Sequence, residues 1–483
     1  MFLGLDLGTS GVRALLVDAN GGVIGSAEAT YSVTRPHPGW SEQDPAEWLA
    51  ACRDTFLELR KSNAQAYKAI RGIGVAGHMH GATLLDRHDK VLRPCILWND
   101  TRSHEQAARL DAQADVRALS GNIVFPGFTA PKLLWVAEKE PEIFAQTAKV
   151  LLPKDYVGLW LTGKHVSDMS DSAGTAWLDV KERRWSQALL GASGMRQDQM
   201  PDLVEGSEIA GTLRADLAAE LGLSEAVSIV GGAGDNAAAA CGAGALKEGD
   251  GFVSLGTSGV LLAAKDNFFP SPASAVHTFC HAIPDTWYQM GVILSATDSL
   301  NWLSRNLGVG AAELAGNLGN KINGPSGIQF LPYLSGERTP HNDSAIRGAF
   351  LGLDVSLGHN ELTQSVLEGV SFALRDSLEA LKSTGTRFDS LMALGGGAQS
   401  PYWVELIATV LDLPVTLPEQ GEFGAALGAA RLAICGVTGA TPDEIMTKPA
   451  IKYTIQPRAE LRSAYDASYQ TFRRAYPAVK GLL

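Results

Sequence analysis

The sequence lacks the features of a membrane, secreted or nucleic-acid-binding protein. No run of apolar residues is long enough to cross a bilayer, and the first residues (MFLGLD) lack the basic start of a secretory signal. The net charge is -12, and no cluster of Lys or Arg is long enough to follow a phosphate backbone. We therefore expect a cytoplasmic protein with no nucleic-acid or membrane partner.

Cysteine is also scarce. The chain has 5 cysteines, none of them spaced as Cys-x-x-Cys: Cys52, Cys95, Cys241, Cys280 and Cys435. An odd number at such spacings is typical of reduced, mostly buried thiols and argues against a disulfide or zinc framework. The pattern agrees with a reducing compartment.

Length and pattern favour two large domains. The chain has 483 residues, whereas a single core stops growing at roughly 250 to 300 residues. Residues 45–61 are expected to form a helix, with Asp44 as its N-cap and Pro45 at its first position, and residues 70–76 a strand. Because strand and helix patterns alternate, we predict a mixed α/β fold with domains at residues 1–245 and 246–483.

The six residues LGTSGV occur twice, at positions 7–12 and 255–260. Each copy lies between two apolar runs, which predicts a β-hairpin at residues 3–17 and another at 251–264. A second similarity between the two halves is a predicted helix of small side chains, at residues 235–245 and again at 424–433. Because Gly lets the backbone approach and amides and hydroxyls donate, two such turns facing a cleft would hold phosphates. The alternative is two ordinary hairpins with similar turns.

Two aspartates stand next to these features. Asp6 precedes the first turn, where Ser254 takes the equivalent place before the second. A carboxylate there would repel a phosphate unless a divalent cation lay between them, so we expect Asp6 to hold Mg²⁺, directly or through water. Asp235 follows a buried strand and a glycine-rich turn at the start of a helix. It suits an N-cap, or a base that takes the proton of a hydroxyl attacking a γ-phosphate, and the two roles are compatible.

Other polar groups follow predicted strands. His78 and His80 would point to one side of a strand with period two, and a hydroxyl-rich ligand suits them better than zinc, because no third ligand lies nearby. Residues 98–102 (WNDTR) set polar groups beside an aromatic ring, which suits a sugar, with a solvated turn as the alternative. Residues 394–400 repeat strand, glycine turn and helix, which suits the nucleoside end of ATP.

Two further matches to known motifs are misleading. Residues 158–165 (GLWLTGKH) have the spacing of a Walker A loop, but His165 stands where Ser or Thr must hold Mg²⁺, so we predict a helix end capped by Gly163. Residues 72–77 (GIGVAG) match the dinucleotide fingerprint, yet the motif is itself the apolar strand and no helix follows it.

The chain resembles the FGGY family of carbohydrate kinases over nearly its whole length. The resembling segments, in the family's order, are DLGTSGVR, GFTAPKLLWVAEKE, GGAGDN, SLGTSG, PYLSGERTPHND, GAFLGLDVSLGHNELTQSVLEG and LGGGAQSPYW. WSEQDP, GHMHGATLLD, ILWND and LLPKDY are similar to the family members that convert D-xylulose to D-xylulose 5-phosphate. The resemblance implies two ribonuclease-H-like domains hinged over a central cleft, as in the sugar kinase/actin superfamily, with ATP and Mg²⁺ as cofactors.

The resemblance also implies roles for single residues. Asp235 would be the catalytic base, and Asp6 would support activity from the metal side. The residues expected to contact the sugar are Met79, His80, Trp98, Asp100, Arg102 and Asn236. The residues expected to bind ATP are Thr9, Ser10, Gly11, Arg13, Gly256, Thr257 and Ser258 at the phosphates, and Gly395, Gly396, Gly397 and Ser400 at the adenosine.

Rival functions stay open at this point. The same family includes kinases for ribulose, gluconate and glycerol. An actin-like or chaperone-like ATPase would share the fold but release ADP without a sugar. A nicotinamide oxidoreductase rests only on the weak match at residues 72–77. The sequence also leaves open whether the chain forms a homodimer.

Overall fold

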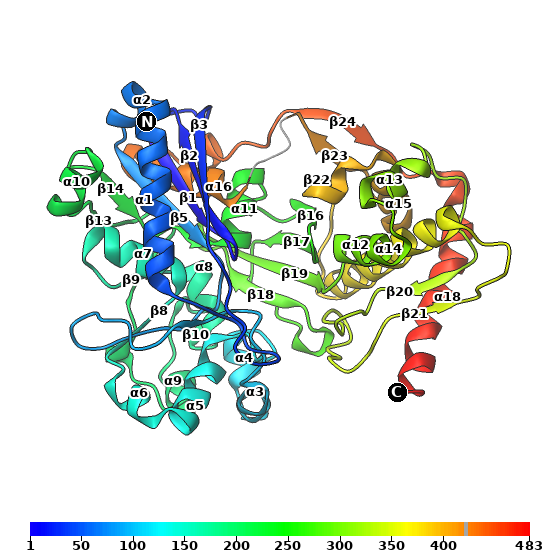
Figure 1. The fold of residues 1–483 in the computed structure, drawn as a ribbon, viewed down its shortest axis with the longest axis horizontal. Coiled ribbons are helices and arrows are strands. Elements are labelled where there is room, and N and C mark those ends of the chain that lie inside the picture. The colour runs from blue at the N-terminus through cyan, green and yellow to red at the C-terminus, as the bar shows by residue number, and fades with distance from the viewer. Residues whose placement is uncertain (420–423) are drawn as a thin grey trace.

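The computed structural model describes residues 1–419 and 424–483, which form two lobes, each built around its own β-sheet (Figure 1). Helices pack against both sheets, so the predicted α/β class is confirmed. Among the helices of these residues, none combines the length and the apolar character that a membrane span requires.

The first sheet contains the N-terminal hairpin and, beside it, the central strand of the predicted region 70–76. β1 pairs antiparallel with β2 and parallel with β5. β5 is buried along its whole length, as a parallel strand covered on both faces should be. The strands, in spatial order, are β13 (Ile209–Thr212), β14 (Ser228–Val230), β5 (Gly72–Gly77), β1 (Phe2–Leu7), β2 (Gly11–Val17) and β3 (Val23–Thr30), with β15 (Ala233–Gly234) also on β5.

Helix α1 (Pro45–Ser62) covers β2 and β3 and begins as the sequence predicts. The Asp44 carboxylate accepts a hydrogen bond from the Ala46 amide at 2.9 Å, and Pro45 occupies the first helical position. The other helices of the first lobe are α2 (Ala64–Lys68), α3 (His104–Asp111), α4 (Val116–Ser120), α5 (Thr129–Lys139), α6 (Pro141–Gln146), α7 (Pro153–Thr162), α8 (Met169–Ser172), α9 (Gln187–Ala192), α10 (Ala215–Leu221) and α11 (Asp235–Ala243). α7 ends at Gly163, whose φ of 72° confirms the predicted C-cap in place of a Walker A loop.

Short two-stranded pairs extend the first lobe below its sheet. They are β4 (Glu42–Gln43) with β7 (Cys95–Ile96), β6 (Thr83–Leu85) with β8 (Lys149–Leu151), β9 (Val166–Asp168) with β12 (Asp202–Val204), and β10 (Leu178–Asp179) with β11 (Arg184–Trp185). Because β7 ends at Ile96, Trp98 lies in the loop that follows it.

The second sheet begins with the second predicted hairpin, β16 and β17. In spatial order its strands are β18 (His277–Cys280), β19 (Trp287–Ile293), β17 (Gly259–Lys265), β16 (Gly251–Leu255), β22 (Leu391–Leu394), β23 (Val415–Pro418) and β24 (Ile451–Ile455). A separate pair joins β20 (Gln329–Leu331) and β21 (Ala349–Leu351). The helices after residue 245 are α12 (Thr297–Leu307), α13 (Ala311–Asn317), α14 (His359–Lys382), α15 (Pro401–Leu411), α16 (Ala425–Thr438), α17 (Pro442–Ile445) and α18 (Arg462–Lys480).

Helix α16 comes from the second half of the chain but packs on β1 and β5 of the first sheet and on α11. The approach is very close: a Cβ added to Gly4 would lie 1.8 Å from the Ala426 carbonyl oxygen, and one added to Gly428 would lie 1.8 Å from that of Ala238. The small residues of both helices are therefore required by packing. The domain boundary at residue 245 stays a prediction. In the sequence it falls between the strands of the two sheets, but α16, which follows it, packs on the first sheet.

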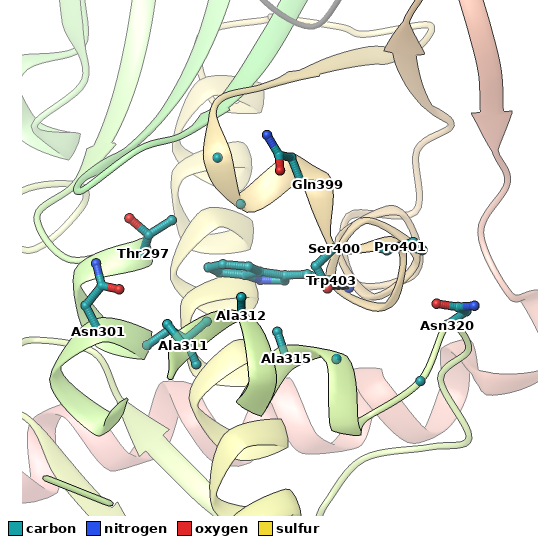
Figure 2. Close-up of a pocket in the computed structure, with 15 residues that line it drawn as sticks. Thr297, Asn301, Ala311, Ala312, Ala315, Asn320, Gln399, Ser400, Pro401 and Trp403 are labelled. Atoms are coloured by element: carbon teal, nitrogen blue, oxygen red, sulfur yellow. Dashed lines mark hydrogen bonds between the residues drawn. The ribbon is translucent and has the colours of Figure 1, made fainter. Parts of the chain in front are cut away.

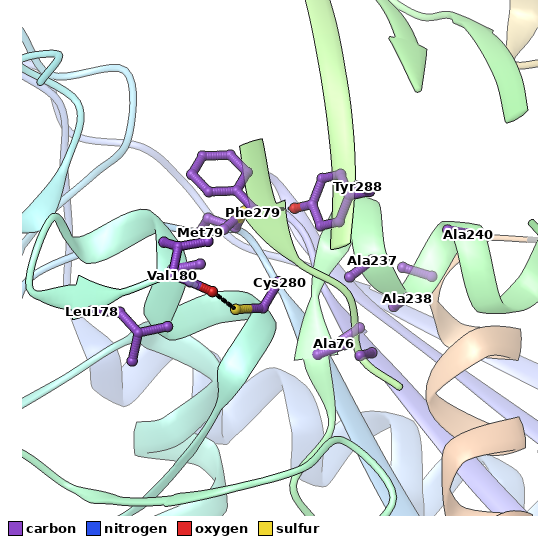
Figure 3. Close-up of a cluster of buried hydrophobic side chains, with 14 of the residues drawn as sticks. Ala76, Met79, Leu178, Val180, Ala237, Ala238, Ala240, Phe279, Cys280 and Tyr288 are labelled. Carbon is purple, nitrogen blue, oxygen red and sulfur yellow. Dashed lines mark hydrogen bonds between the residues drawn. The ribbon is translucent and has the colours of Figure 1, made fainter. Parts of the chain in front are cut away.

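Strand β18 of the second sheet is fastened to the first lobe. The Asn122 side chain donates to the Thr278 carbonyl at 2.8 Å and accepts from the Thr278 amide at 3.0 Å. The Val180 carbonyl accepts from the Trp287 indole at 2.8 Å and from the Cys280 thiol at 3.4 Å, the second of which Figure 3 shows. Figure 3 also shows Phe279 and Tyr288 packed beside Met79 of the first lobe. The two lobes thus share one continuous core at this edge.

Candidate active site

Asp235 stands where the first sheet, a glycine turn and helix α11 meet. Gly232 in the turn has a φ of 75°, and a Cβ there would lie 2.0 Å from the Val75 carbonyl oxygen, so only glycine fits. Gly234 is the N-cap of α11, which makes Asp235 the first helical residue and not the cap. Its Oδ1 accepts from the Asn236 amide at 2.7 Å and from Asn236 Nδ2 at 2.8 Å. Within the described residues no hydrogen bond involves Oδ2, which leaves it available to a ligand.

Asp6 lies one residue before the end of β1 and close to Asp235. Asp6 and Ala233 flank Ala76 of β5 from either side, and Asp235 follows two residues after Ala233. Burial raises the pKa of Asp6 to about 7; the negative charge of Asp235 raises it further and Arg13 opposes the shift. Burial likewise raises the pKa of Asp235 to about 6, against the two hydrogen bonds from Asn236. The site therefore holds two carboxyl groups that titrate near neutral pH.

The first turn, residues 8–11, is held by its carbonyl oxygens. Tyr31 donates its hydroxyl to the Gly8 carbonyl and its amide to the Ser10 carbonyl, the latter at 3.1 Å. Gln43 donates to the Thr9 carbonyl at 2.6 Å, and the Gly8 amide donates to the Gly11 carbonyl at 2.9 Å. Because the carbonyl oxygens of the turn point toward protein donors, its opposite side, which carries backbone amides, is available to bind an anion.

The side chains of the same turn contact its neighbours. The Trp98 indole donates to Thr9 Oγ1 at 3.0 Å. Arg13 lies opposite Asp6 across the hairpin and pairs with Glu28 at 2.6 Å. The predicted phosphate residues Thr9, Ser10, Gly11 and Arg13 therefore lie on one hairpin, and Trp98 reaches it from the loop after β7.

The second turn, residues 256–258, is held in the same way. Gly256 accepts hydrogen bonds from the Thr297 amide at 2.9 Å and from Thr297 Oγ1 at 2.7 Å. Thr257 accepts from the Ala296 amide at 2.8 Å. Both donors stand at the start of α12, so this helix fixes the turn from the carbonyl side.

A cavity of about 270 Å³ lies between the lobes, with Asp235 in its wall. It brings together seven of the residues predicted from sequence, from both halves of the chain: Met79, His80, Trp98, Asp235, Asn236, Gly256 and Ser258. The rest of its lining is Ser254, Val260, His277, Phe279, Met290, Val292 and Arg338. From the sequence, His277 and Phe279 would share one face of a strand, and so would Met290 and Val292. The sequence does not show that these faces line a cavity.

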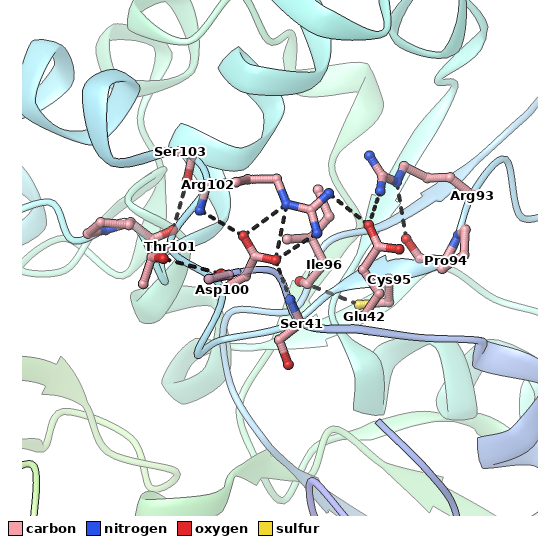
Figure 4. A network of polar contacts seen from close by, with 12 residues as sticks. Ser41, Glu42, Arg93, Pro94, Cys95, Ile96, Asp100, Thr101, Arg102 and Ser103 are labelled. Atoms are coloured by element: carbon pink, nitrogen blue, oxygen red, sulfur yellow. Dashed lines mark hydrogen bonds and ion pairs between the residues drawn. The ribbon is translucent and has the colours of Figure 1, made fainter. Parts of the chain in front are cut away.

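Asp100 and Arg102 lie outside this lining, so the structure does not bring them together with the other residues predicted to contact a sugar. Both are buried, and the Arg102 guanidinium makes a two-pronged contact with the Asp100 carboxylate, with Nη2 2.7 Å from Oδ2. Asp100 Oδ2 also accepts from the Ser41 amide at 2.6 Å, and Arg102 pairs with Glu42 at 2.7 Å (Figure 4). The Arg102 guanidinium also stacks 3.6 Å over the Trp40 ring. The charged groups of Asp100 and Arg102 therefore bind each other and neighbouring protein groups, and these contacts stabilise the loop that carries Trp98.

The two histidines also separate. The strand ends at Gly77 and His80 has a φ of 71°, so the expectation that both rings share one side was wrong. His78 packs edge-on against Trp48, whereas His80 stacks on Phe128 with ring centroids 4.7 Å apart and lines the cavity. No group of three metal-ligating side chains occurs within residues 1–419 and 424–483, so zinc finds no ligand set there.

His80 is held in one protonation state. Burial and the nearby Lys132 charge lower the pKa of His80 to about 3, so the ring is neutral. Its Nδ1 lies 2.6 Å from the Gly174 carbonyl oxygen, which only accepts, so Nδ1 carries the proton. Nε2 is then an acceptor, which suits a sugar hydroxyl.

A second cavity of about 450 Å³ adjoins the second turn (Figure 2). Ala311, Ala312 and Ala315 of α13 form one wall, and Gln399 and Ser400 lie on the other. The remaining lining residues are Thr297, Leu300, Asn301, Gly316, Gly319, Asn320, Gly396, Gly397, Pro401 and Trp403.

This second cavity contains most of the residues that the sequence predicts for adenosine. Of the residues predicted for adenosine, Gly396, Gly397 and Ser400 line it, whereas Gly395, with a φ of 86°, turns the chain behind it. Thr297 lines the cavity and also holds Gly256, so a base and ribose here would have their phosphates at the second turn. The wall from α13 was not indicated by the sequence, since alanines on a helix surface carry no distinctive chemistry.

Comparison with known proteins shows the family to which the whole chain is similar. Residues 1–242 match the model of the N-terminal domain of the FGGY family of carbohydrate kinases, and residues 251–437 match its C-terminal domain. The chain is 44% identical to a xylulose kinase of Escherichia coli (strain K12), with 100% of both chains covered. It is 58% identical to a solved structure from Brucella ovis, described as a xyloylose kinase, with a TM-score of 0.98 and 100% of both chains covered. It is 29% identical to a solved xylulose kinase of Rhodospirillum rubrum, with a TM-score of 0.92 and 100% and 99% of the two chains covered.

Proposed function

The chain belongs to the FGGY family of carbohydrate kinases, and from this premise we propose that it transfers the γ-phosphoryl group of ATP to D-xylulose, forming D-xylulose 5-phosphate. The fold is accordingly that of the sugar kinase/actin superfamily. The observation that carries the proposal is the Asp235 carboxylate in the wall of a sugar-sized cavity, beside Asp6 and a turn suited to phosphate. The relatives named xylulose kinase favour this sugar over ribulose, gluconate or glycerol.

The sugar would bind in the cavity between the lobes. His80 offers its Nε2 acceptor, and Asn236 stands beside Asp235 at the same wall. Met79 and Trp98 add apolar surface, as aromatic and sulfur side chains do for the C–H faces of sugars. These four side chains would orient one hydroxyl toward Asp235.

Asp235 would act as the general base. A base works best when its pKa lies near the operating pH, and burial brings the pKa of Asp235 to about 6. Oδ1 is held by Asn236, so the other oxygen would take the proton as the hydroxyl attacks phosphorus. Because the base forms part of a structured helix start, its position costs no rearrangement during the reaction.

The nucleotide would span the second cavity and the two turns. Its base and ribose fit the glycine and alanine walls, where Gly396 and Gly397 leave room for a flat ring. Its phosphates would accept from the amide sides of the turns at residues 8–11 and 256–258. The transferred group would then lie between ATP and Asp235.

The donor set fits a magnesium ion. Asp235 is close enough for its negative charge to raise the pKa of Asp6, so two carboxyl groups lie together at this site. Mg²⁺ is commonly held by one or two carboxylates together with substrate phosphates. Asp6 would hold it, directly or through water. When bound with ATP, the ion would neutralise phosphate charge and orient the phosphates.

The cytoplasmic location is part of the proposal. It is supported by the five cysteines, which are all buried and free, as is typical of proteins in a reducing compartment.

The test is the release of ADP, followed spectrophotometrically with Mg²⁺ and ATP against a panel of acceptors. We expect D-xylulose to give the highest kcat/KM among D-xylulose, D-ribulose, gluconate and glycerol, with little ADP released when no sugar is added. ADP release at the same rate without any sugar would favour the actin-like or chaperone-like ATPase. A higher kcat/KM for another acceptor would reject D-xylulose as the substrate.

A further inference from the structure

The sugar cavity contains a guanidinium group that the proposed reaction does not yet use. Arg338 lies in the loop after β20 and lines the cavity, half-buried, 4.4 Å over the Phe125 ring. The charge of the neighbouring, buried Glu337 acts on Arg338, but the Glu337 carboxylate accepts from the Leu294 and Arg338 backbone amides and, among the described residues, forms no ion pair with the guanidinium. A guanidinium that lines a ligand cavity and has no carboxylate bound to it there is suited to an acceptor on the ligand.

Arg338 is held at one end by a chain of side chains. Its Nη1 lies 3.3 Å from His277 Nε2, and His277 Nδ1 lies 3.3 Å from Asn122 Oδ1. Because a guanidinium only donates, Nε2 accepts from Arg338 and Nδ1 carries the proton toward Asn122. Asn122 is itself fixed by its two hydrogen bonds with the Thr278 backbone. The chain therefore fixes both the tautomer of His277 and the place of Arg338.

This group stands far from the phosphate side of the cavity. His277 belongs to β18, and β19 and β17 separate β18 from β16, which carries Ser254 and the second turn. Adjacent strands are about 4.8 Å apart, so three steps place His277 roughly 14 Å from the β16 backbone. Thr339 binds the Val292 backbone through both its amide and its hydroxyl, at 3.0 Å each, which places Arg338 along the same edge of β19 as β18.

The phosphate end and the Arg338 end of the cavity indicate which parts of the sugar would bind at each. The hydroxyl that receives the phosphoryl group must lie at the Asp235 and phosphate end, and in D-xylulose this is the hydroxyl on C5. The opposite end of the sugar carries the C2 carbonyl and the C1 hydroxyl. A guanidinium only donates, and a carbonyl oxygen accepts in the plane of its carbon; a hydroxyl on a tetrahedral C2 also accepts, but in another direction.

We propose that Arg338, positioned by His277 and Asn122, donates a hydrogen bond to the carbonyl oxygen of the bound ketose and makes the pocket prefer a ketose to the polyol of the same length. This inference rests on the proposed function and adds the group that recognises the substrate's keto end. Arg338 is the binding residue, and His277 and Asn122 are positioning residues.

The test compares D-xylulose with xylitol and D-arabinitol, which carry a hydroxyl at C2 in place of the carbonyl. For the wild type and Arg338→Gln, KM and kcat are measured with D-xylulose, and inhibition constants with the two polyols. We expect Arg338→Gln to raise the KM for D-xylulose by about 10- to 100-fold, the scale of a lost hydrogen bond to a charged donor. The polyol inhibition constants and the KM for ATP should change by less than about threefold.

Two further variants keep the result interpretable. Arg347→Gln removes an exposed guanidinium from the same segment, outside the cavity, and should leave all constants unchanged. If Arg338→Gln does not fold by its melting curve, Arg338→Lys takes its place and should give a smaller rise in the same KM, because the charge stays but the fork is lost. An equal loss for ketose and polyols, or an unchanged KM for D-xylulose, would overturn the proposal. A wild type that turns over another acceptor but not D-xylulose would instead reject the proposed function, and this inference with it.

Discussion

Asp235 and Asn236 form a unit in which one residue holds the other. Both hydrogen bonds from Asn236 reach the same oxygen of Asp235, at 2.7 and 2.8 Å. The bonds favour the ionised carboxylate, whereas burial favours the protonated acid, and burial dominates to give a pKa of about 6. The carboxylate is thus mostly ionised at neutral pH while remaining basic enough to accept a proton.

Asp235→Asn should abolish most of the activity. The change is nearly isosteric and removes the proton acceptor, so transfer to the sugar should fall by roughly 10²- to 10⁴-fold. Steady-state kinetics with D-xylulose measures this, and calorimetric ADP binding with a melting curve controls for an intact fold. A folded, ADP-binding variant that keeps activity within about tenfold of the wild type would rule out Asp235 as the base.

The same substitution should also change stability with pH. The carboxyl titrates near 4 in the unfolded chain and at about 6 in the folded protein. Between these values the folded protein binds more protons, so the stability contributed by Asp235 falls as pH rises through about 4 to 6. At pH 7, Asp235→Asn should therefore have a higher Tm than the wild type, with the difference shrinking at pH 4. A Tm difference independent of pH across this window would contradict the raised pKa.

His80→Ala should raise the KM for D-xylulose while leaving the KM for ATP nearly unchanged. A lost buried hydrogen bond costs about 0.5 to 1.5 kcal/mol, or up to roughly tenfold in KM. Initial rates at saturating ATP and then at saturating sugar separate the two constants. Equal increases in both would point to a structural role for the ring, which also stacks on Phe128.

At the scale of elements, the glycine turn before α11 is supported from below by buried charges. Lys154 of α7 lies 2.6 Å from Asp155 and 2.8 Å from Asp168 and donates to the Gly231 carbonyl at 3.3 Å. Asp168 binds the Ser170 amide and hydroxyl, and Ser170 Oγ accepts from the Gly234 amide at 3.1 Å. α7 and α8 are thus tied to the turn that places Asp235.

Lys154→Met should destabilise the fold severely. It leaves the Asp155 and Asp168 carboxylates buried without their cation, and breaking a buried pair in this way costs about 3 to 5 kcal/mol. Urea or thermal unfolding measures the change. Lys164→Met, an exposed lysine just after the same helix, is the matched control and should shift stability by less than about 0.5 kcal/mol. A Lys154→Met variant as stable as this control would show that the cluster contributes nothing to the fold.

Local elements could be read from the sequence, and contacts between distant segments could not. Both hairpins, the strand at residues 72–77, the cap of α1 and the helix end at Gly163 follow from apolar period, turn residues and capping groups. The contact of Asp100 with Arg102 could not be predicted, because adjacent polar residues in a sequence show no sign of whether they face a ligand or one another. His277 and Arg338 were missed because their place in the cavity depends on β18 docking on the other lobe, a contact that no local pattern encodes.

At the scale of the whole molecule, the residues of the proposed site are divided between the two lobes. The first turn and Asp235 belong to the first lobe, and the second turn and the alanine-lined cavity belong to the second. The lobes share a core where β18 docks on the first lobe and where α16 packs. Motion about these two contacts would narrow the cleft and exclude water from the transferring group.

Small-angle scattering should therefore detect closure. We expect the radius of gyration to fall when saturating D-xylulose and a non-hydrolysable ATP analogue are added together, and ATP hydrolysis without sugar to be slow. The nucleotide analogue alone serves as the control for binding without the acceptor. An unchanged radius with both ligands, together with sugar-independent hydrolysis, would refute closure as the reason for sugar-dependent turnover.

The position of α16 has a consequence for folding during synthesis on the ribosome. This helix covers β1 and β5, yet its residues, 425–438, are synthesised after nearly nine-tenths of the chain. Until then the first strands to emerge have no cover on the face that receives α16, and the shallow surface of Gly4 and Gly74 stays open to solvent. The N-terminal lobe, although its strands are all synthesised by α11, can therefore complete its packing only after the second lobe has been translated. A nascent chain arrested after α11 and before α16 would expose an apolar sheet face to chaperones.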